Sequence, residues 1–127
     1  MIDQVISGTI TGNVTIERFV PARRAFRFVS SPVTTSTSIL ENWQENGSSS
    51  SGFGTHITGS TTGENGFYAT PSGNPSLFTY DNSVITPALT PISDTDMNTL
   101  TAGEAYLLFV RGDRTIDVTS NLSLIHI

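Results

Sequence analysis

The sequence predicts an all-β domain, an antiparallel β-sandwich of jelly-roll-like form with one short helix near residues 38–45. Three observations lead to this fold class. Short apolar runs with a period of two recur along the chain, clusters of Gly, Pro, Asn and Ser separate them, and one segment alone has the apolar spacing of a helix. The hydrophobic content of 36% suits one modest core, so we expect a single domain.

We expect the module to occupy residues 1–121. Residues 122–127, Leu-Ser-Leu-Ile-His-Ile, resemble the translation of a sequencing-library adapter, so the module is expected to be truncated near Asn121. Deleting this tail should leave the melting temperature nearly unchanged. The residues after Met1 lack the basic and apolar regions of a signal peptide, so signal and sorting segments are expected to lie outside this sequence.

The first strands are predicted in the N-terminal quarter of the chain. Residues 13–33 carry the densest apolar pattern and are expected to lie at the centre of the sheet. Residues 5–10 and 14–20 are β-branched runs that predict two strands. Pro21 ends the second run, because proline donates no backbone hydrogen bond to a neighbouring strand.

A third strand is predicted after this proline. Phe26 and Phe28 alternate with Ala25, Arg27 and Val29, which is the period of a strand with two distinct faces. Because the phenylalanines make their face the more apolar one, we expect Phe26 and Phe28 to lie in the core.

The helix is predicted from its cap and its apolar stripe. Ser38 is a good N-cap residue, and Glu41 follows it by three positions, as in a capping box. Ile39, Leu40 and Trp43 then fall on one side of a helix. Trp43 is therefore expected to pack against the core.

The second half of the chain predicts further strands, at residues 55–58, 77–80, 105–110 and 115–118, with residues 84–89 as a weak edge strand. The run at 105–110 is apolar on both faces, as expected for a strand in the middle of a two-layer sandwich. We expect its Leu107 and Phe109 to join Phe26 and Phe28 in one buried cluster.

Composition excludes several functional classes. A net charge of −5 and a pI near 4.7 argue against general nucleic-acid binding, which needs a basic face. The absence of cysteine excludes disulfides and thiolate metal sites. No stretch is long and apolar enough to insert into a membrane as a helix, and no cofactor is expected.

The arginines at positions 18, 23, 24 and 27 could form the one basic surface of this acidic chain. Guanidinium groups suit the oxyanions of a sulfated or phosphorylated glycan. The simpler interpretation is that Arg18, Arg23, Arg24 and Arg27 pair with Glu17 and other acids or lie along the sheet surface.

Three short motifs have both a functional and a structural interpretation. Asp94-Thr95-Asp96 has the carboxylate spacing of calcium loops, but it lacks the glycine and the bidentate glutamate of an EF-hand, and we expect no metal site. Arg111-Gly112-Asp113 spells an adhesion tripeptide, although Gly-Asp is also ordinary turn chemistry. His56 is expected to make a local hydrogen bond and not to serve in a triad.

Enzymatic residues are not apparent in the chain. Glu17 and Asp117 are the acids within strand patterns from which a rigid carboxylate pair could be built, and no nucleophile-elbow motif is present. Trp43 and Tyr80 could stack on a sugar ring, and an exposed coplanar aromatic pair would favour that role. We therefore expect no catalytic residues and leave the binding residues open.

Five long segments span nearly all of the chain up to Asn121: GNVTIERFVPARRAFRFVSSPVTTSTSI, NWQENG, GFGTHITGSTTGENGF, GNPSLFTY and LTAGEAYLLFVRGDRTIDV. In this order they resemble a repeated β-rich module of large secreted and cell-surface proteins of the Bacteroidota, often exported by the type IX secretion route. The resemblance implies a non-enzymatic structural or adhesive role, with other domains of the same polypeptide, and surface glycans, as partners. The alternative is a carbohydrate-binding module of a secreted polysaccharide-degrading enzyme.

Overall fold

The protein is seen in a computed structural model that describes residues 11–12, 15–18, 20, 23–47, 54–81, 83–86 and 88–112. The strands expected at 5–10 and 115–118 and the adapter-like residues 122–127 lie outside the described residues. Within the run expected to form a strand at 14–20, the described residues 15–18 and 20 belong to no helix or strand. That part of the sequence prediction is wrong, because a β-branched run forms a strand only where a neighbour offers it a ladder of hydrogen bonds.

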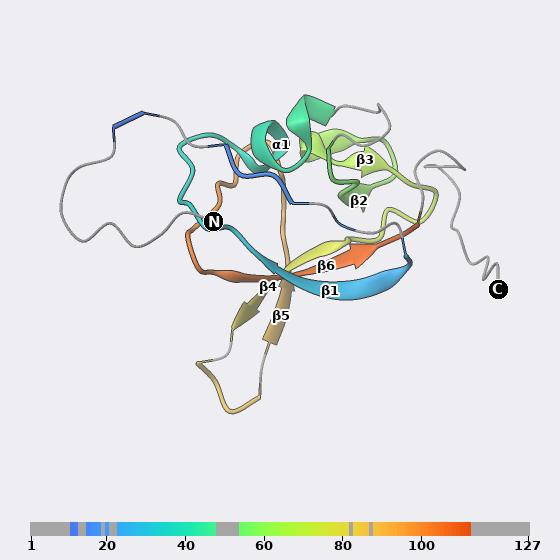
Figure 1. The fold of residues 1–127 in the computed structure, drawn as a ribbon. Coiled ribbons are helices and arrows are strands. Elements are labelled where there is room, and N and C mark those ends of the chain that lie inside the picture. The colour runs from blue at the N-terminus through green and yellow to red at the C-terminus, as the bar shows by residue number, and fades with distance from the viewer. Residues whose placement is uncertain are drawn as a thin grey trace.

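Four antiparallel strands form the main sheet, in the order β1-β6-β4-β5 (Figure 1). They are β1 (Ala25–Ser30), β4 (Leu77–Asp81), β5 (Ala88–Pro91) and β6 (Ala105–Val110). The predicted strands at 77–80 and 105–110 are confirmed, and β6 is internal as expected. In the described sheet β1 lies at an edge, so the expectation that residues 13–33 form the centre of the sheet is wrong.

The helix begins where its cap predicts. α1 (Ile39–Asn42) follows the N-cap Ser38, whose side chain accepts a hydrogen bond from the backbone N–H of Glu41 at 3.2 Å. A 3₁₀ turn, η1 (Glu45–Gly47), comes next. The α-helix is shorter than predicted because Glu45 and Asn46 have positive φ angles of 48° and 58°, which a right-handed helix cannot accommodate.

A smaller, parallel two-stranded sheet lies beside α1. It consists of β2 (Thr58–Ser60) and β3 (Tyr68–Ala69), joined through a second 3₁₀ turn, η2 (Glu64–Gly66). The strand predicted at 55–58 therefore begins three residues later than expected. Both 3₁₀ turns have the sequence Glu-Asn-Gly, and in both the asparagine has a φ of 58°.

The hydrophobic core lies on one face of the main sheet, which α1 and the β2–β3 sheet cover (Figure 1). Its buried members come from α1, β4 and β6, from the residues just before β2 and β3, and from the loop before β6: Ile39, Ile57, Phe67, Leu77, Leu100, Tyr106 and Leu108. Trp43 is half-buried at the margin of this core, and its indole ring meets the Tyr106 ring edge-on with centroids 5.2 Å apart. The core position expected for Trp43 is thus confirmed in outline.

The expectation that Phe26 and Phe28 lie in the core is wrong. The alternation in β1 is as predicted, but both phenylalanine side chains are 59% exposed. The side of β1 that faces the core carries Arg27, which lies opposite the buried Leu108 of β6. A period of two defines two faces and does not say which of them a distant part of the chain will cover.

The described strands thus make a mostly β-structured domain around one antiparallel sheet and one α-helix. The sheet formed by the described strands is open and does not close into a barrel. Among the helices within the described ranges, none has the length and apolar character needed to cross a bilayer.

Candidate functional site

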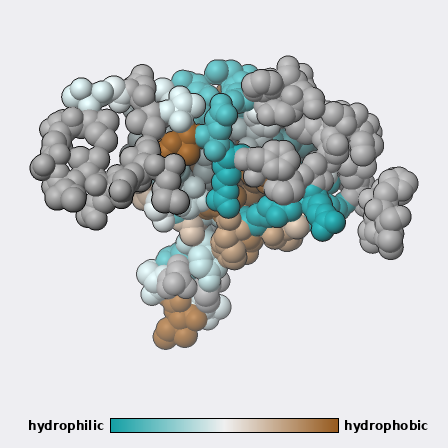
Figure 2. Space-filling view, in the orientation of Figure 1, coloured by the Kyte–Doolittle hydropathy of each residue, from teal (hydrophilic) through white to brown (hydrophobic). Residues whose placement is uncertain are grey.

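The most distinctive surface of the molecule is the face of the main sheet that turns away from the core, which we call the open face. Cross-strand pairing brings its members to one side of the sheet, and they are mainly aromatic and aliphatic: Phe26, Phe28, Phe78, Tyr80, Leu89, Pro91, Leu107 and Phe109. Figure 2 shows brown and tan atoms on this lower side of the sheet. Apolar surface gathered in one place in this way marks an interaction site more often than scattered exposure does.

The rings of the open face contact one another across the strands. Phe26 and Phe109 lie opposite each other on β1 and β6, with ring centroids 4.7 Å apart. Phe28 and Tyr80 flank β6 from either side, and their rings meet edge-on at 5.3 Å. Leu107 lies opposite Phe28 of β1 and Phe78 of β4 and is only 9% exposed. The cluster expected from the sequence therefore exists, but on the open face, where only Leu107 is buried.

Two arginines border the aromatic cluster at one corner. The guanidinium carbons of Arg24 and Arg111 lie 5.2 and 5.6 Å from the centroid of the Phe109 ring, within the range of a cation–π contact. Burial and the positive charge of Arg24 lower the pKa of Arg111. Neither arginine forms an ion pair with a carboxylate of the described residues. The corner thus brings together two positive charges that no described carboxylate pairs with, in a chain whose net charge is −5.

Arg111 has a structural role within this corner. Its Nε donates a hydrogen bond to Thr58 Oγ1 at 3.0 Å, and its terminal nitrogen donates one to the Asn74 carbonyl at 2.9 Å. These bonds tie the end of β6 to β2, so Arg111 is not presented as part of an adhesion tripeptide. Asp113 of that tripeptide lies outside the described residues.

At least one arginine of the predicted basic surface lies away from Arg24. Arg27 points to the core side of the sheet, and its Nε is buried without a hydrogen bond to any described residue. Arg18 and Arg23 are exposed. The structure therefore brings Arg24 and Arg111 together and does not unite the four arginines on one face; the proposed pairing with Glu17 is not found among the described side chains.

The hairpin of β4 and β5 projects from the body of the domain (Figure 1). Its described tip, residues 83–86, carries Val84 and Ile85, which are 45% and 105% exposed. Figure 2 shows the tip as a separate brown cluster. At the base of the tip, the carboxylate of Asp81 accepts hydrogen bonds from the backbone and side chain of Ser83, at 2.8 and 2.6 Å. These bonds lower the pKa of Asp81, so its carboxylate is ionised at neutral pH.

Asp94 of the candidate calcium loop caps a turn. Its Oδ1 accepts hydrogen bonds from the backbone N–H groups of Met97 and Asn98, at 3.1 and 3.0 Å, and its Oδ2 accepts one from the Ser93 hydroxyl at 2.7 Å. Asp96 is exposed and does not share these contacts. No three side chains of Asp, Glu or His from the described part of the chain gather closely enough to hold a metal ion.

The remaining candidate residues are dispersed. His56 packs edge-on against Tyr68, with ring centroids 4.8 Å apart. Glu17 is exposed, and Asp117, its possible partner in a carboxylate pair, lies outside the described residues. Trp43 and Tyr80 belong to opposite sides of the sheet, and the ring pair that Tyr80 makes with Phe28 has an interplanar angle of 74°, so it is not coplanar.

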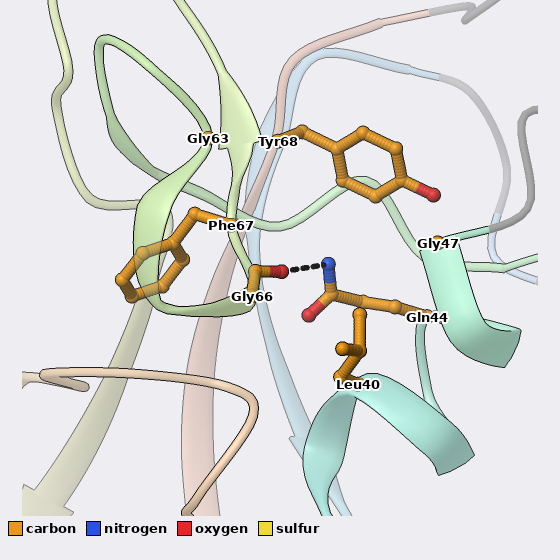
Figure 3. A pocket seen from close by; sticks show the side chains of 7 residues that line it. All are labelled: Leu40, Gln44, Gly47, Gly63, Gly66, Phe67 and Tyr68. Carbon is orange, nitrogen blue, oxygen red and sulfur yellow. Dashed lines mark hydrogen bonds between the residues drawn. The ribbon is translucent and has the colours of Figure 1, made fainter.

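A depression of about 280 Å³ lies between the two Glu-Asn-Gly turns and is lined by Leu40, Gln44, Phe67 and Tyr68 together with glycines of both turns (Figure 3). No carboxylate, imidazole or aliphatic hydroxyl lines it. Gln44 is fully buried beneath it, so a molecule resting there does not reach the amide. The depression therefore offers no acid–base pair, and the phenol of Tyr68 is the polar side-chain group on its wall that is not fully buried.

Comparison with protein-family models, with curated proteins and with solved structures gives no match to this chain.

The open face is the feature that sequence reasoning missed. A signal for it exists in the alternation of side chains along the strands, because the phenylalanines of β1, β4 and β6 all fall on the same side once the strands are paired.

Proposed function

We propose that this domain is a non-enzymatic structural or adhesive module of a large secreted or cell-surface bacterial protein, and that it acts by burying the open face against another protein. The observation that carries the proposal is the exposure of Phe26 and Phe28, each 59%, on the aromatic face of the main sheet. Fully burying one such side chain is worth roughly 1.5–3 kcal/mol, so a protein surface that covers both gains substantially.

The chemistry of the face favours a protein partner. Sugar-binding sites combine a flat aromatic platform with several hydrogen-bonding groups, because each hydroxyl of the ring needs a partner when it leaves water. On the open face, Tyr80 supplies a single phenol, while Leu89, Pro91 and the phenylalanines supply none. The rings also meet at angles of 37° and 74° instead of lying in one plane.

The jelly-roll-like sandwich expected from the sequence enters here as part of the proposal. One sheet of a sandwich has an apolar face that a second sheet covers at a spacing of about 10 Å. The open face has this composition. A covering layer supplied by another domain would complete the sandwich and explain why aromatic side chains face water in the isolated module.

Retention on coated surfaces tests the proposal. We expect the wild type to be retained on immobilised collagen, fibronectin or a second preparation of the chain, and the Phe26→Ser/Phe28→Ser double variant to be retained much less. Met97→Ser is the matched control, because Met97 is 80% exposed but lies off the open face. Equal retention of wild type and double variant, including no retention of either, would count against the proposal.

The same assay examines the two competing functions. Retention on cellulose, xylan or starch that Tyr80→Ala abolishes would favour the carbohydrate-binding alternative. Hydrolysis of any polysaccharide that Glu17→Gln or Asp117→Asn abolishes would overturn the non-enzymatic proposal.

A further inference from the structure

The tip of the β4–β5 hairpin is an unusual surface for a protein to leave in water. Ile85 is fully exposed and Val84 is nearly half exposed, because both lie at the end of a projecting two-stranded hairpin and no described neighbour covers them. The ionised carboxylate of Asp81 lies at the base of this tip and is held by Ser83. The tip thus combines aliphatic side chains with one fixed negative charge.

The open face offers the complementary combination. Phe26 and Phe28 provide an exposed apolar surface, and Arg24 lies beside them at the arginine corner. The guanidinium of Arg24 makes no hydrogen bond or ion pair with a described residue, in contrast to that of Arg111, which is engaged by Thr58 and Asn74. Arg24 is therefore the group at this corner that remains available to a carboxylate.

We propose that the β4–β5 hairpin tip of a second copy of this chain docks on the open face, with Val84 and Ile85 against Phe26 and Phe28 and with the Asp81 carboxylate paired to Arg24. This inference rests on the proposed function, since it names the protein that covers the open face. Charge complementarity supports a second copy as the occupant, because each copy carries both the unpaired cation and the projecting anion with apolar side chains beside each.

The two surfaces differ, so one copy acts as donor and the other as acceptor of the hairpin. Reciprocal docking closes the pair into a two-fold dimer, and docking in a single direction extends it into a chain. A contact made by one hairpin tip is small and belongs to the weak class of interfaces, so association is expected at high protein concentration. The overall negative charge of both copies opposes it further, which makes the local Arg24–Asp81 attraction decisive for orientation.

A charge exchange between two variants tests the pairing. Arg24→Asp and Asp81→Arg should each lower the association constant of the full chain at least about fivefold, because each places like charges together at the contact. An equimolar mixture of the two variants should restore association to near the wild-type level, since in mixed pairs both contacts again join opposite charges. Sedimentation velocity over a range of concentrations up to about 1 mM provides the measurement.

Matched controls isolate the site. Arg23→Asp and Asp96→Arg make the same charge changes at exposed positions that belong to neither surface, and mixing them should rescue nothing. Phe28→Ser and Ile85→Ser should each weaken self-association about tenfold. A mixture of the two variants should still form one contact, between the intact tip of the Phe28→Ser chain and the intact open face of the Ile85→Ser chain. Circular dichroism and thermal melting of each variant check that it remains folded.

The outcomes separate this inference from the function on which it rests. A wild type that stays monomeric at every concentration, or a charge-exchange mixture that fails to associate, would overturn docking by a second copy. If the double variant of Phe26 and Phe28 still loses retention on another immobilised protein, the open face is an interface for a different partner. Binding to dextran sulfate that Arg24→Asp abolishes, without self-association, would instead assign the arginine corner to a sulfated glycan and also overturn this inference.

Discussion

The side-chain Nε2 of Gln44 donates a hydrogen bond to the backbone carbonyl of Gly66 at 3.0 Å, and this bond joins the two Glu-Asn-Gly turns of the domain (Figure 3). Gln44 follows α1 and is fully buried, while Gly66 ends η2, which leads into β3. The bond thus fastens the helix to the small sheet that together cover the core. The other amide atom, Oε1, is buried without a hydrogen bond to any described residue.

Shortening Gln44 should therefore be costly, and replacing it with an apolar side chain of similar length should cost less. Gln44→Ala leaves a cavity and an unpaired carbonyl on Gly66, with an expected loss of about 2–4 kcal/mol in the free energy of unfolding. Gln44→Met leaves the same carbonyl unpaired, but it fills the space and removes the unpaired Oε1, so its loss should be smaller by at least about 1 kcal/mol. Urea denaturation measures both, and equal losses for the two variants would show that packing around this side chain does not matter.

Two glycines with almost the same backbone conformation should respond differently to alanine. Gly66 and Gly103 have φ angles of 77° and 78°. A Cβ on Gly66 would lie 2.6 Å from Thr95 Oγ1 and 2.8 Å from the Asp96 nitrogen, whereas a Cβ on Gly103 would have no atom within 4 Å.

Gly103→Ala should cost about 1–2 kcal/mol, the conformational penalty of a left-handed residue. Gly66→Ala should cost roughly 3–5 kcal/mol, because overpacking adds to that penalty. Chemical denaturation gives the loss in unfolding free energy for each variant, and the difference between the two losses is the cost of the steric clash at Gly66. Similar losses at both sites would mean that the 94–98 loop moves aside.

The two sides of the main sheet should differ in their sensitivity to truncation. Leu108 is 2% exposed on the core side, and Leu108→Ala should cost about 2–5 kcal/mol. Phe28→Ala on the open face should cost less than about 1.5 kcal/mol in dilute protein, because most of that side chain is already in water. The comparison is made by thermal melting at low concentration; a loss at Phe28 as large as at Leu108 would show that the open face is covered in solution.

The turn that Asp94 caps should make stability depend on acid. Hydrogen bonds from the Ser93 hydroxyl and from Asn98 and Met97 lower the pKa of Asp94. Because the folded pKa lies below that of the unfolded chain, the ionised carboxylate stabilises the fold above about pH 4, and this contribution is lost as the pH falls through the lowered value.

Asp94→Ala should cost about 0.5–2 kcal/mol at pH 7, as the loss of a capping residue does. Melting temperatures measured from pH 7 down to about pH 3 should show the gap between wild type and variant narrowing at the acid end. A gap that stays constant across this range would show that the charge on Asp94 contributes nothing to the cap.

The strands that depend on local pattern were predictable from the sequence, and the side of the sheet that is buried was not. The run at β6 is apolar at every position and is found as an internal strand, and the Ser38 cap marks the start of α1. The alternation in β1 was also correct. Its buried side depends on where α1 and the β2–β3 sheet pack, and these elements come from distant parts of the sequence, so Phe26 and Phe28 were assigned to the wrong face.

The same limit applies to the candidate site. The pairing of strands puts Phe26 beside Phe109 and Phe28 beside Tyr80, contacts between residues more than 50 positions apart in the sequence. Arg24 was singled out for its charge, but its position beside the Phe109 ring depends on the same pairing. The Asp94 motif had the carboxylate spacing of calcium loops, and only the structure shows that its carboxylate accepts hydrogen bonds from Met97 and Asn98 and so caps a turn.

The open face also determines how the domain responds to temperature. Apolar surface that is already hydrated in the folded state adds nothing to the heat capacity of unfolding. The heat-capacity change per residue should therefore be smaller than the value for compact domains, which is about 12–15 cal/mol/K. A smaller heat-capacity change flattens the curve of stability against temperature. When a partner covers Phe26 and Phe28, burial of this apolar surface gives a negative heat-capacity change of binding. The heat-capacity change that is absent from folding is then found in association.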